Sequence, residues 1–265
     1  MAKIVITGAS GVLGSAIYRA LKTTNHAVIG LANSRAQGGL SKIDLTDQSA
    51  IQDFLRESKP DWVIHCAAER RPDVAEKDPD GAQRLNAEVP GHLASLAKDL
   101  GFTLIYISTD YVFDGTAPPY GPASQTNPLQ LYGKSKRDGE NAVSSVAGAK
   151  IAILRVPVLY GPAPHNSDSA VNILLDIVQD QSGKQYKMDH YATRSEQAAA
   201  FNNSIIAGTN PSRNMRYSNP PTGPGATSRP KDCHLSTKET EDLDIPGGLG
   251  LSLFEEWWAV HLGKQ

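Results

Sequence analysis

Tyr132 and Lys136 form a Tyr-x-x-x-Lys pair that could exchange a proton with a bound ligand. Side chains four residues apart on a helix share one face, so we expect the phenol beside the ammonium. A nearby ammonium lowers the pKa of a phenol from about 10, which favours proton transfer near neutral pH. With hydride from a nicotinamide, such a pair predicts the reduction of a ketone. The spacing alone is weak evidence, because Tyr18 and Lys22 repeat it in a pair that we interpret as structural.

Thr109 is a candidate for the same site because of its position. It follows the run 103–108, whose β-branched and aromatic residues predict a strand. In open α/β sheets, ligands bind at the carboxyl ends of the strands. We therefore expect the Thr109 hydroxyl to hydrogen-bond a substrate carbonyl.

Three glycines between the first expected strand and the first expected helix predict a dinucleotide site. The run 7–14 reads Thr-Gly-Ala-Ser-Gly-Val-Leu-Gly. Gly8 would allow a sharp turn, Gly11 a close approach of the backbone to a pyrophosphate, and Gly14 close packing of the helix on the strand. The helix N-terminus would offer free N–H groups and its positive dipole end to the phosphates. The alternative is a tight turn with no ligand.

The end of the second expected strand predicts NADP rather than NAD. NAD sites usually place an acidic residue there to accept from the ribose hydroxyls, whereas this chain has no acidic residue before Asp44. The segment reads Asn33-Ser34-Arg35, and a guanidinium can pair with a 2′-phosphate. Asp44 and Leu45 are expected to meet the adenine ring. The alternative for Arg35 is an ordinary solvated surface residue.

Other candidates follow the fourth expected strand. Arg70, in the charged run 69–73, could reach the cofactor phosphates, and the alternative for this run is a solvated turn. Cys66 is expected to be a small packing residue at the cofactor edge rather than a nucleophile. The seven histidines show no ligand-like spacing, so no metal site is predicted.

Residues 1 to about 160 alternate between strand and helix patterns. Short apolar runs indicate buried strands, and apolar residues at helical spacing indicate helices between them. This alternation favours a parallel sheet covered on both faces, a Rossmann-type doubly wound α/β fold. The expected strands are 4–6, 27–31, 42–43, 62–65, 103–108 and 151–156. The expected helices are 12–21, one around 51–55, 85–100 with Gly101 as its cap, 132–146, 171–178 and 251–262.

The second half of the chain is less regular. We predict an NADP-binding domain at 1–160 and a small, apparently incomplete substrate domain at 161–265. Residues 182–250 show no clean period. Five prolines fall within 211–230, which argues against a helix or a central strand there and predicts a long loop.

The composition argues against several classes of protein. Lys and Arg number 26 against 28 Asp and Glu, and the net charge of −2 predicts no binding to nucleic acid or to an anionic membrane. Two cysteines cannot form a disulfide scaffold and favour a reducing compartment. No apolar run approaches about 18 residues, and the N-terminus shows no basic-then-apolar leader. We therefore expect a cytoplasmic protein without a transmembrane helix.

Several of these motifs together resemble the extended short-chain dehydrogenase/reductase superfamily. Within it, the run 108–115 followed by the Tyr-x-x-x-Lys pair resembles the dTDP-4-dehydrorhamnose reductase branch. The run 65–74, His-Cys-Ala-Ala-Glu-Arg-Arg-Pro-Asp-Val, is more specific, and 106–108 and 118–120 support it. With these runs, residues 1 to about 190 resemble the family of methionine adenosyltransferase regulatory beta subunits. A fainter resemblance to the same family is present over residues 228–245.

The resemblance implies site residues as well. The reductase branch implies a catalytic trio of Thr109, Tyr132 and Lys136, the last two of which also contact the nicotinamide ribose. Beside the glycines Gly8, Gly11 and Gly14, the regulatory family implies NADP contacts at Ser10, Val12, Leu13, Asn33, Ser34, Arg35, Asp44, Leu45, Cys66, Arg70, Tyr132 and Leu159.

The resemblance leaves three functional hypotheses. The first is an NADP-binding, non-catalytic subunit that partners the catalytic subunit of methionine adenosyltransferase in S-adenosylmethionine biosynthesis. The second is an NADPH-dependent reductase of a nucleotide-sugar ketone. The third is a variant without function, because both families have a further strand and helix where this chain has the polar, proline-rich stretch 195–225.

Overall fold

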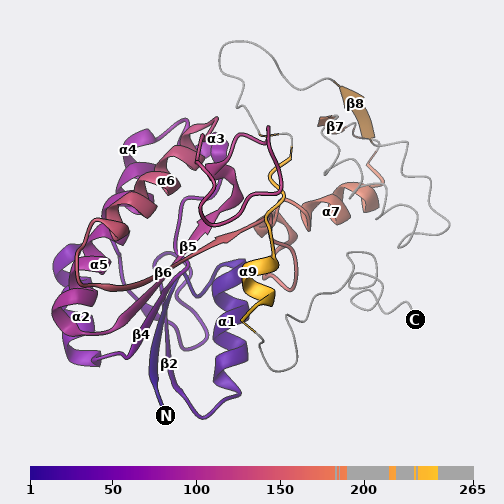
Figure 1. The fold of residues 1–265 in the computed structure, drawn as a ribbon. Coiled ribbons are helices and arrows are strands. Elements are labelled where there is room, and N and C mark those ends of the chain that lie inside the picture. The colour runs from indigo at the N-terminus through magenta and orange to yellow at the C-terminus, as the bar shows by residue number, and fades with distance from the viewer. Residues whose placement is uncertain (183, 185, 190–214, 219–229, 231, 244–265) are drawn as a thin grey trace. The chain divides into compact units, whose positions relative to one another are not determined.

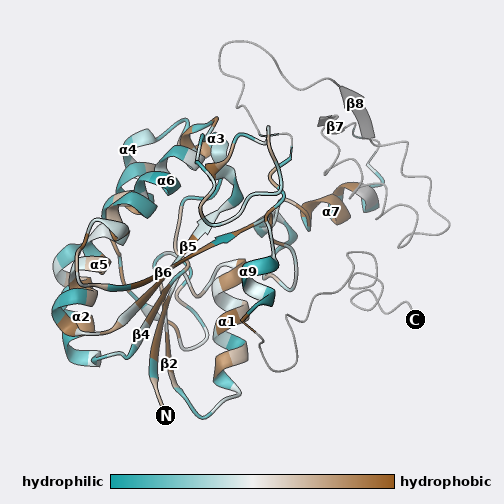
Figure 2. Ribbon diagram, in the orientation of Figure 1, coloured by the Kyte–Doolittle hydropathy of each residue, from teal (hydrophilic) through white to brown (hydrophobic). Residues whose placement is uncertain are grey.

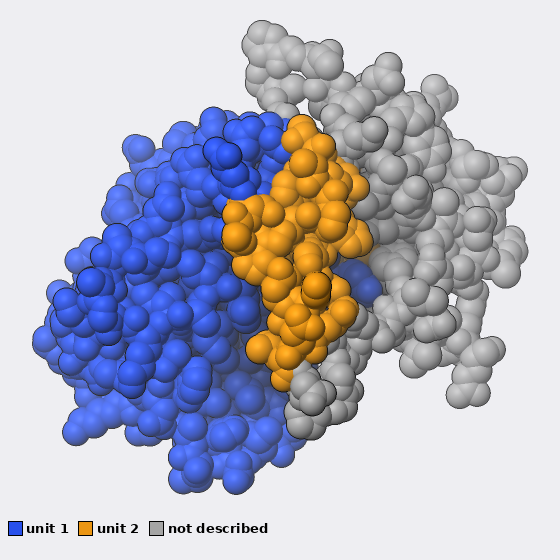
Figure 3. Space-filling model, in the orientation of Figure 1, with its two compact units in different colours: residues 1–114, 125–163, 227–230 blue, residues 115–124, 164–226, 231–265 orange. Residues whose placement is uncertain are grey.

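The computed structural model describes residues 1–182, 184, 186–189, 215–218, 230 and 232–243 (Figure 1). The chain divides into two compact units (Figure 3). Unit 1 comprises residues 1–114, 125–163 and 227–230, and unit 2 comprises residues 115–124, 164–226 and 231–265.

Unit 1 contains a parallel sheet of six strands in the order β3-β2-β1-β4-β5-β6. The order reverses between β1 and β4, which is where doubly wound sheets open a crevice for a ligand. The predicted Rossmann-type fold is confirmed, and the expected strands are present, the third shifted by one residue. The bounds are β1 Lys3–Thr7, β2 Ala27–Ala32, β3 Ser41–Lys42, β4 Trp62–His65, β5 Thr103–Thr109 and β6 Lys150–Val156.

Helices cover both faces of this sheet (Figure 1). The helix α1 packs on one face, while α2, α5 and α6 pack on the other. Shorter turns, which the sequence pattern did not predict, lie between β4 and α5 and after β5. The bounds are α1 Val12–Lys22, α2 Gln48–Ser58, α3 Pro72–Ala75, α4 Pro79–Gln83, the π-helical turn η1 Arg84–Glu88, α5 Val89–Leu100, the 3-10 turn η2 Asp110–Val112 and α6 Leu131–Ser144.

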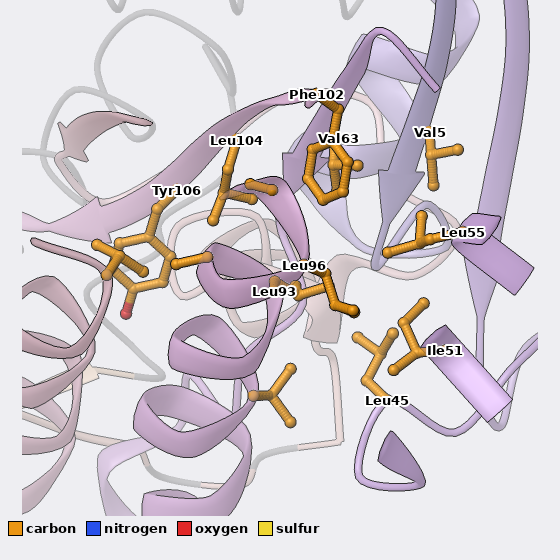
Figure 4. Packing of buried hydrophobic residues seen from close by; sticks show 14 of the residues in the cluster. Val5, Leu45, Ile51, Leu55, Val63, Leu93, Leu96, Phe102, Leu104 and Tyr106 are labelled. Atoms are coloured by element: carbon orange, nitrogen blue, oxygen red, sulfur yellow. The ribbon is translucent and has the colours of Figure 1, made fainter. Parts of the chain in front are cut away.

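The main hydrophobic core lies between the sheet and the helices α2, α5 and α6 (Figure 4). The central strands β1, β2 and β4 are mostly apolar in Figure 2, as expected of strands in the middle of a parallel sheet. Each fully buried aliphatic side chain contributes about 1.5–3 kcal/mol to folding. The core includes Val5, Val63 and Leu104 from the strands, Ile51 and Leu55 from α2, and Leu93 and Leu96 from α5.

The expected helix 85–100 is confirmed, although its first turn is π-helical rather than α-helical. The chain forms the π-helical turn η1 there before α5 begins. Pro90 has no N–H to donate to the Asn86 carbonyl four residues earlier. That carbonyl instead accepts the Tyr106 hydroxyl at 3.0 Å. The predicted cap at Gly101 is confirmed by its left-handed φ of +83°.

Unit 2 contains a second, two-stranded parallel sheet of β7 (Tyr186–Asp189) and β8 (Met215–Ser218). The loop predicted for 211–230 is therefore wrong at β8, whose four residues include no proline. Helix α7 (Ile173–Gln179) confirms the helix expected near 171–178. The described residues of unit 2 also form the short turns η3 (Asn166–Asp168) and α9 (Lys238–Glu241). The predicted helix 251–262 lies outside the described residues.

Within the described residues, no helix has the length and apolarity that a membrane crossing requires.

Candidate functional site

The glycine turn joins β1 to α1 at the point where the strand order reverses. Gly8 has a φ of +65°, and a Cβ on it would lie 2.7 Å from the Ala67 nitrogen. A Cβ on Gly14 would overlap the Gly8 carbonyl oxygen. A Cβ on Gly11 would meet only that same oxygen, at 3.3 Å. Gly8 and Gly14 are therefore required by the packing of the turn itself.

The start of α1 has the electrostatics of an anion site. Its N-cap is Gly11, which has no side chain to accept from the first-turn N–H groups, and the first turn carries no acidic residue. By contrast, α2 of unit 1 is capped by the Asp47 side chain, which accepts from the Ala50 N–H at 3.0 Å. The amino end of α1 thus keeps its N–H groups and its positive potential for a phosphate. This arrangement fits a dinucleotide.

The end of β2 presents Asn33, Ser34 and Arg35 as exposed side chains. Beside them, Asp44 accepts from the Thr46 hydroxyl at 2.7 Å and the Thr46 N–H at 2.9 Å. These bonds, with a further one from Asn33, lower the pKa of Asp44. The Asp44 carboxylate therefore stays ionised.

Leu45 is only 7% exposed and packs in the main hydrophobic core, so it stabilises the fold in addition to any contact with a ligand. Ser10, Val12 and Leu13, the other predicted contacts near this end of the site, lie in the glycine turn and the first turn of α1. Leu159 is partly buried in the connection that follows β6.

Thr109 and Tyr132 are brought together by β5 and α6. Thr109 ends β5, and Tyr132 lies in the first turn of α6, which Gln130 caps by accepting from the Gly133 N–H at 3.0 Å. The nearby Thr109 hydroxyl acts to lower the pKa of Tyr132. Tyr111 packs edge-on against the Tyr132 ring, at 6.2 Å between centroids.

Lys136 points its amine at β5 and not at the Tyr132 phenol. Its Nζ donates to the Ile107 carbonyl at 2.7 Å and lies 4.0 Å from the centroid of the Tyr106 ring. The side chain is 2% exposed, and this burial lowers the pKa of Lys136 to about 7. Glu140 raises this pKa in part, but its own carboxylate is bound to Arg155 at 2.7 Å.

The pKa of Tyr132 shifts in the direction opposite to the one the spacing suggested. Burial raises it above the ordinary value for a phenol, and the negative charge of Asp110 adds to the rise. Arg70 is the cation that lowers the pKa of Tyr132. Lys136 is not among the groups that lower the pKa of Tyr132, because its amine is held at the Ile107 carbonyl of β5; there its charge acts on His65 and Cys66 instead.

Asn86 is a buried hub that the sequence reasoning missed. Its Oδ1 accepts from the Glu69 N–H at 2.9 Å, and its Nδ2 donates to the Glu69 carbonyl at 2.9 Å and to the Ser135 hydroxyl at 3.0 Å. It is fully buried. Asn86 therefore ties the loop after β4, which carries Arg70, to helix α6. The available signal was an amide between Leu85 and Ala87 at the start of the expected helix.

His65 and Cys66 are kept uncharged by burial at the end of β4. His65 Nδ1 and Thr7 Oγ1 are hydrogen-bonded at 2.7 Å, and burial lowers the pKa of His65 to about 3. Burial raises the pKa of the Cys66 thiol to about 12, so it is a poor nucleophile. Cys66 packs with the α1-side core, as expected for a packing residue.

The described residues include no group of three or more His, Cys, Asp or Glu side chains that could hold a metal ion.

The fold and the site together define a dinucleotide-binding α/β protein with a Tyr-Lys pair at the carboxyl edge of its sheet. The chain matches the family described as the RmlD substrate binding domain over residues 2–199, and it belongs to that family.

Within the family, the chain is similar to proteins named methionine adenosyltransferase 2 subunit beta. It is 46% identical to that of Bos taurus and 48% identical to that of Xenopus tropicalis, each over 193 residues. These matches cover 72% of this chain and 57% of each relative, so the chain spans little more than half of their length. It is also 39% identical over 167 residues, 62% of this chain and 55% of the relative, to a probable low-salt glycan biosynthesis reductase of Haloferax volcanii.

Solved structures agree with the fold. A dTDP-4-dehydrorhamnose reductase from Clostridium acetobutylicum is 26% identical, with a TM-score of 0.75 over 98% of both chains. The reductase from Bacillus anthracis, solved in complex with NADP, is 25% identical, with a TM-score of 0.70 over 96% of this chain and 95% of that one.

Proposed function

We propose that this chain is an NADP-binding, non-catalytic regulatory subunit of methionine adenosyltransferase. The observation that carries the proposal is the 46–48% identity to proteins named as that subunit, over 193 residues. The family match over residues 2–199 includes the run 65–74, and within that run the Glu69 backbone is bonded to Asn86. In this proposal, the catalytic subunit of methionine adenosyltransferase is the partner and S-adenosylmethionine biosynthesis is the process. The proposal includes a cytoplasmic location and a division into an NADP-binding domain, 1–160, and a substrate-domain remnant, 161–265.

NADP is the proposed cofactor because the chain offers a complementary group for each of its parts. The uncapped amino end of α1 would hold the diphosphate. Arg35 would pair with the 2′-phosphate, and Leu45 would lie along the adenine. Tyr132 and Lys136 would contact the nicotinamide ribose. When bound, the nicotinamide supplies a hydride donor or acceptor.

Co-purification tests the partner. The full-length chain and the purified catalytic subunit of methionine adenosyltransferase would be mixed at micromolar concentrations and analysed by size-exclusion chromatography with light scattering. The proposal predicts a hetero-oligomer, with and without NADP. The absence of a complex under both conditions would reject the regulatory proposal and leave the cofactor proposal intact.

The second candidate is an NADPH-dependent reductase of a nucleotide-sugar ketone. It is favoured by the juxtaposition of Thr109 and Tyr132 at the end of β5 and by the similarity to a probable glycan biosynthesis reductase. The test is loss of NADPH absorbance with dTDP-4-dehydrorhamnose and a panel of related keto-sugars. Turnover that Tyr132→Phe abolishes would establish this function. The absence of turnover across the panel would exclude it for these substrates.

A further inference from the structure

Arg155 of β6 binds the Glu140 carboxylate of α6 through a bidentate ion pair. The Arg155 Nε donates to Glu140 Oε1 at 2.9 Å, and its Nη2 donates to Glu140 Oε2 at 2.7 Å. Two parallel bonds fix the orientation of a carboxylate more firmly than a single contact does. The side chains are 18% and 7% exposed, so water and salt screen the pair only weakly.

Phe113 holds the same guanidinium from a third element. The centroid of its ring lies 5.1 Å from Arg155 Cζ, within the range of a cation–π contact, and Phe113 is fully buried. Phe113 directly follows η2, the turn after β5. Arg155 therefore connects β6, α6 and the segment after β5, and Glu140 is not the only group that fixes its position.

Glu140 lies one turn after Lys136 on α6. Residues four apart on a helix share one face, and a carboxylate and an ammonium at this spacing attract each other. The Lys136 amine points at β5 instead, where Nζ donates to the Ile107 carbonyl at 2.7 Å and lies 4.0 Å from the centroid of the Tyr106 ring. The amine and the carboxylate thus have separate partners, although the helix places them side by side.

We propose that Arg155 is a positioning residue for Lys136: by binding both oxygens of Glu140, it prevents Glu140 from binding the amine. An ammonium has three N–H donors, and the bond to Ile107 uses one of them. The others can bind the hydroxyls of a ligand at the carboxyl end of the sheet. An ion pair with Glu140 would draw the amine along α6, away from Tyr132 in the first turn. The inference rests on the proposed nicotinamide site and extends it to a residue of β6.

The other titratable groups around the amine are uncharged near neutral pH. Burial lowers the pKa of His65 to about 3 and raises the pKa of Cys66 to about 12. Burial also raises the pKa of Tyr106 above its ordinary value. The charge of Glu140 raises the pKa of Lys136 even within its ion pair. A Glu140 carboxylate released from that pair would therefore raise the pKa of Lys136 further.

The titration and the position of the Lys136 amine test the inference, and neither measurement needs cofactor or partner. The full-length chain would be labelled with 13C at the lysine Cε and followed by NMR between about pH 5.5 and pH 10, with Lys136→Met to assign the signal. The midpoint of the titration reports the pKa. The Cε protons report the position, because the ring current of Tyr106 shifts protons above its face upfield.

In the wild type, the midpoint should lie near pH 7 and the Cε protons should be shifted upfield. Arg155→Met releases Glu140, so the midpoint should rise by at least about one pH unit and the upfield shift should be lost. Arg137→Met is the matched control, because it breaks the exposed ion pair between Arg137 and Asp138 on the same helix, with 2.9 Å between Nη2 and Oδ1. This control should keep both wild-type values.

Glu140→Gln separates release of the carboxylate from loss of a positive charge. In the Glu140→Gln background, Arg155→Met should leave the midpoint and the upfield shift close to those of Glu140→Gln alone. A wild-type midpoint in Arg155→Met overturns the inference, and so does a rise that Arg137→Met or the double variant reproduces. A rise without loss of the upfield shift overturns it too, because the carboxylate would then act only through space.

If Arg155→Met does not fold, Arg155→Gln replaces it, since a neutral amide cannot neutralise the Glu140 carboxylate. The same rise and the same loss of the upfield shift are then expected, and the absence of either overturns the inference. None of these outcomes depends on whether the chain binds NADP or a partner, so a failure here is distinct from a failure of the proposed function.

Discussion

Asn86→Ala should destabilise unit 1, because Asn86 is the buried connection between the loop after β4 and helix α6. The substitution removes three side-chain hydrogen bonds, two to the Glu69 backbone and one to Ser135. Each contributes about 0.5–1.5 kcal/mol net, so the expected loss in the free energy of unfolding is about 3 kcal/mol. For a domain of this size, 1 kcal/mol moves Tm by about 2–4 °C, which predicts a fall of about 6–12 °C.

Thermal unfolding followed by circular dichroism near neutral pH is the assay. Asn127→Ala is the matched control, because that exposed amide donates to the Asp114 carboxylate at 2.8 Å, and the loss of this exposed bond should cost about 0.5 kcal/mol or less. Asn86→Leu keeps much of the volume but none of the bonds, so it should be as unstable as Asn86→Ala. If the Leu variant matched the wild type, or if the Ala variant lost less than about 1 kcal/mol, the hydrogen-bonding role would be refuted.

Three further predictions concern the cofactor and the buried amine. Arg35→Ala should weaken NADP binding by about 10- to 100-fold, because a charge-assisted bond to the 2′-phosphate is lost, and it should leave NAD binding unchanged. Calorimetric titration with both nucleotides checks this. An equal loss for NADP and NAD would contradict the assignment of Arg35 to the 2′-phosphate. Gly14→Ala should prevent both tight NADP binding and stable folding, since its Cβ would overlap the Gly8 carbonyl, and a variant with wild-type Tm would refute this packing. The pKa of Lys136 lies near 7 in the folded chain, below its value near 10.5 in the unfolded chain. Burying the charged amine therefore lowers the free energy of unfolding at and below about pH 7. This destabilisation disappears as the pH rises towards about 10.5. Lys136→Met should therefore raise Tm near neutral pH, and Tm of the variant should rise less with pH than that of the wild type. A pH profile of Tm identical to that of the wild type would contradict this reasoning.

The elements of unit 1 could be predicted because their signals are local. A strand covered on both faces needs a short apolar run, and a turn with a φ of +65° at Gly8 needs a glycine. The same local reasoning did not indicate the π-helical form of the turn at Arg84–Glu88, where a distant group replaces a local one. The π-helical turn before α5 follows from Pro90, but it is stabilised by the Tyr106 hydroxyl from another strand.

The candidate site likewise has features that follow from the sequence and features that depend on the tertiary structure. The sequence alone identified Thr109, Tyr132, Lys136 and the glycine turn, since residue type and spacing along the chain are sufficient to place them at one edge of a sheet. Only the tertiary structure decided where the Lys136 amine points, which carbonyl it binds, and that the Asp110 carboxylate accepts from the Thr109 hydroxyl. Those properties depend on burial and on hydrogen-bond partners from separate elements. A pKa or a bond direction is set by such neighbours in space, and spacing along the chain does not encode them.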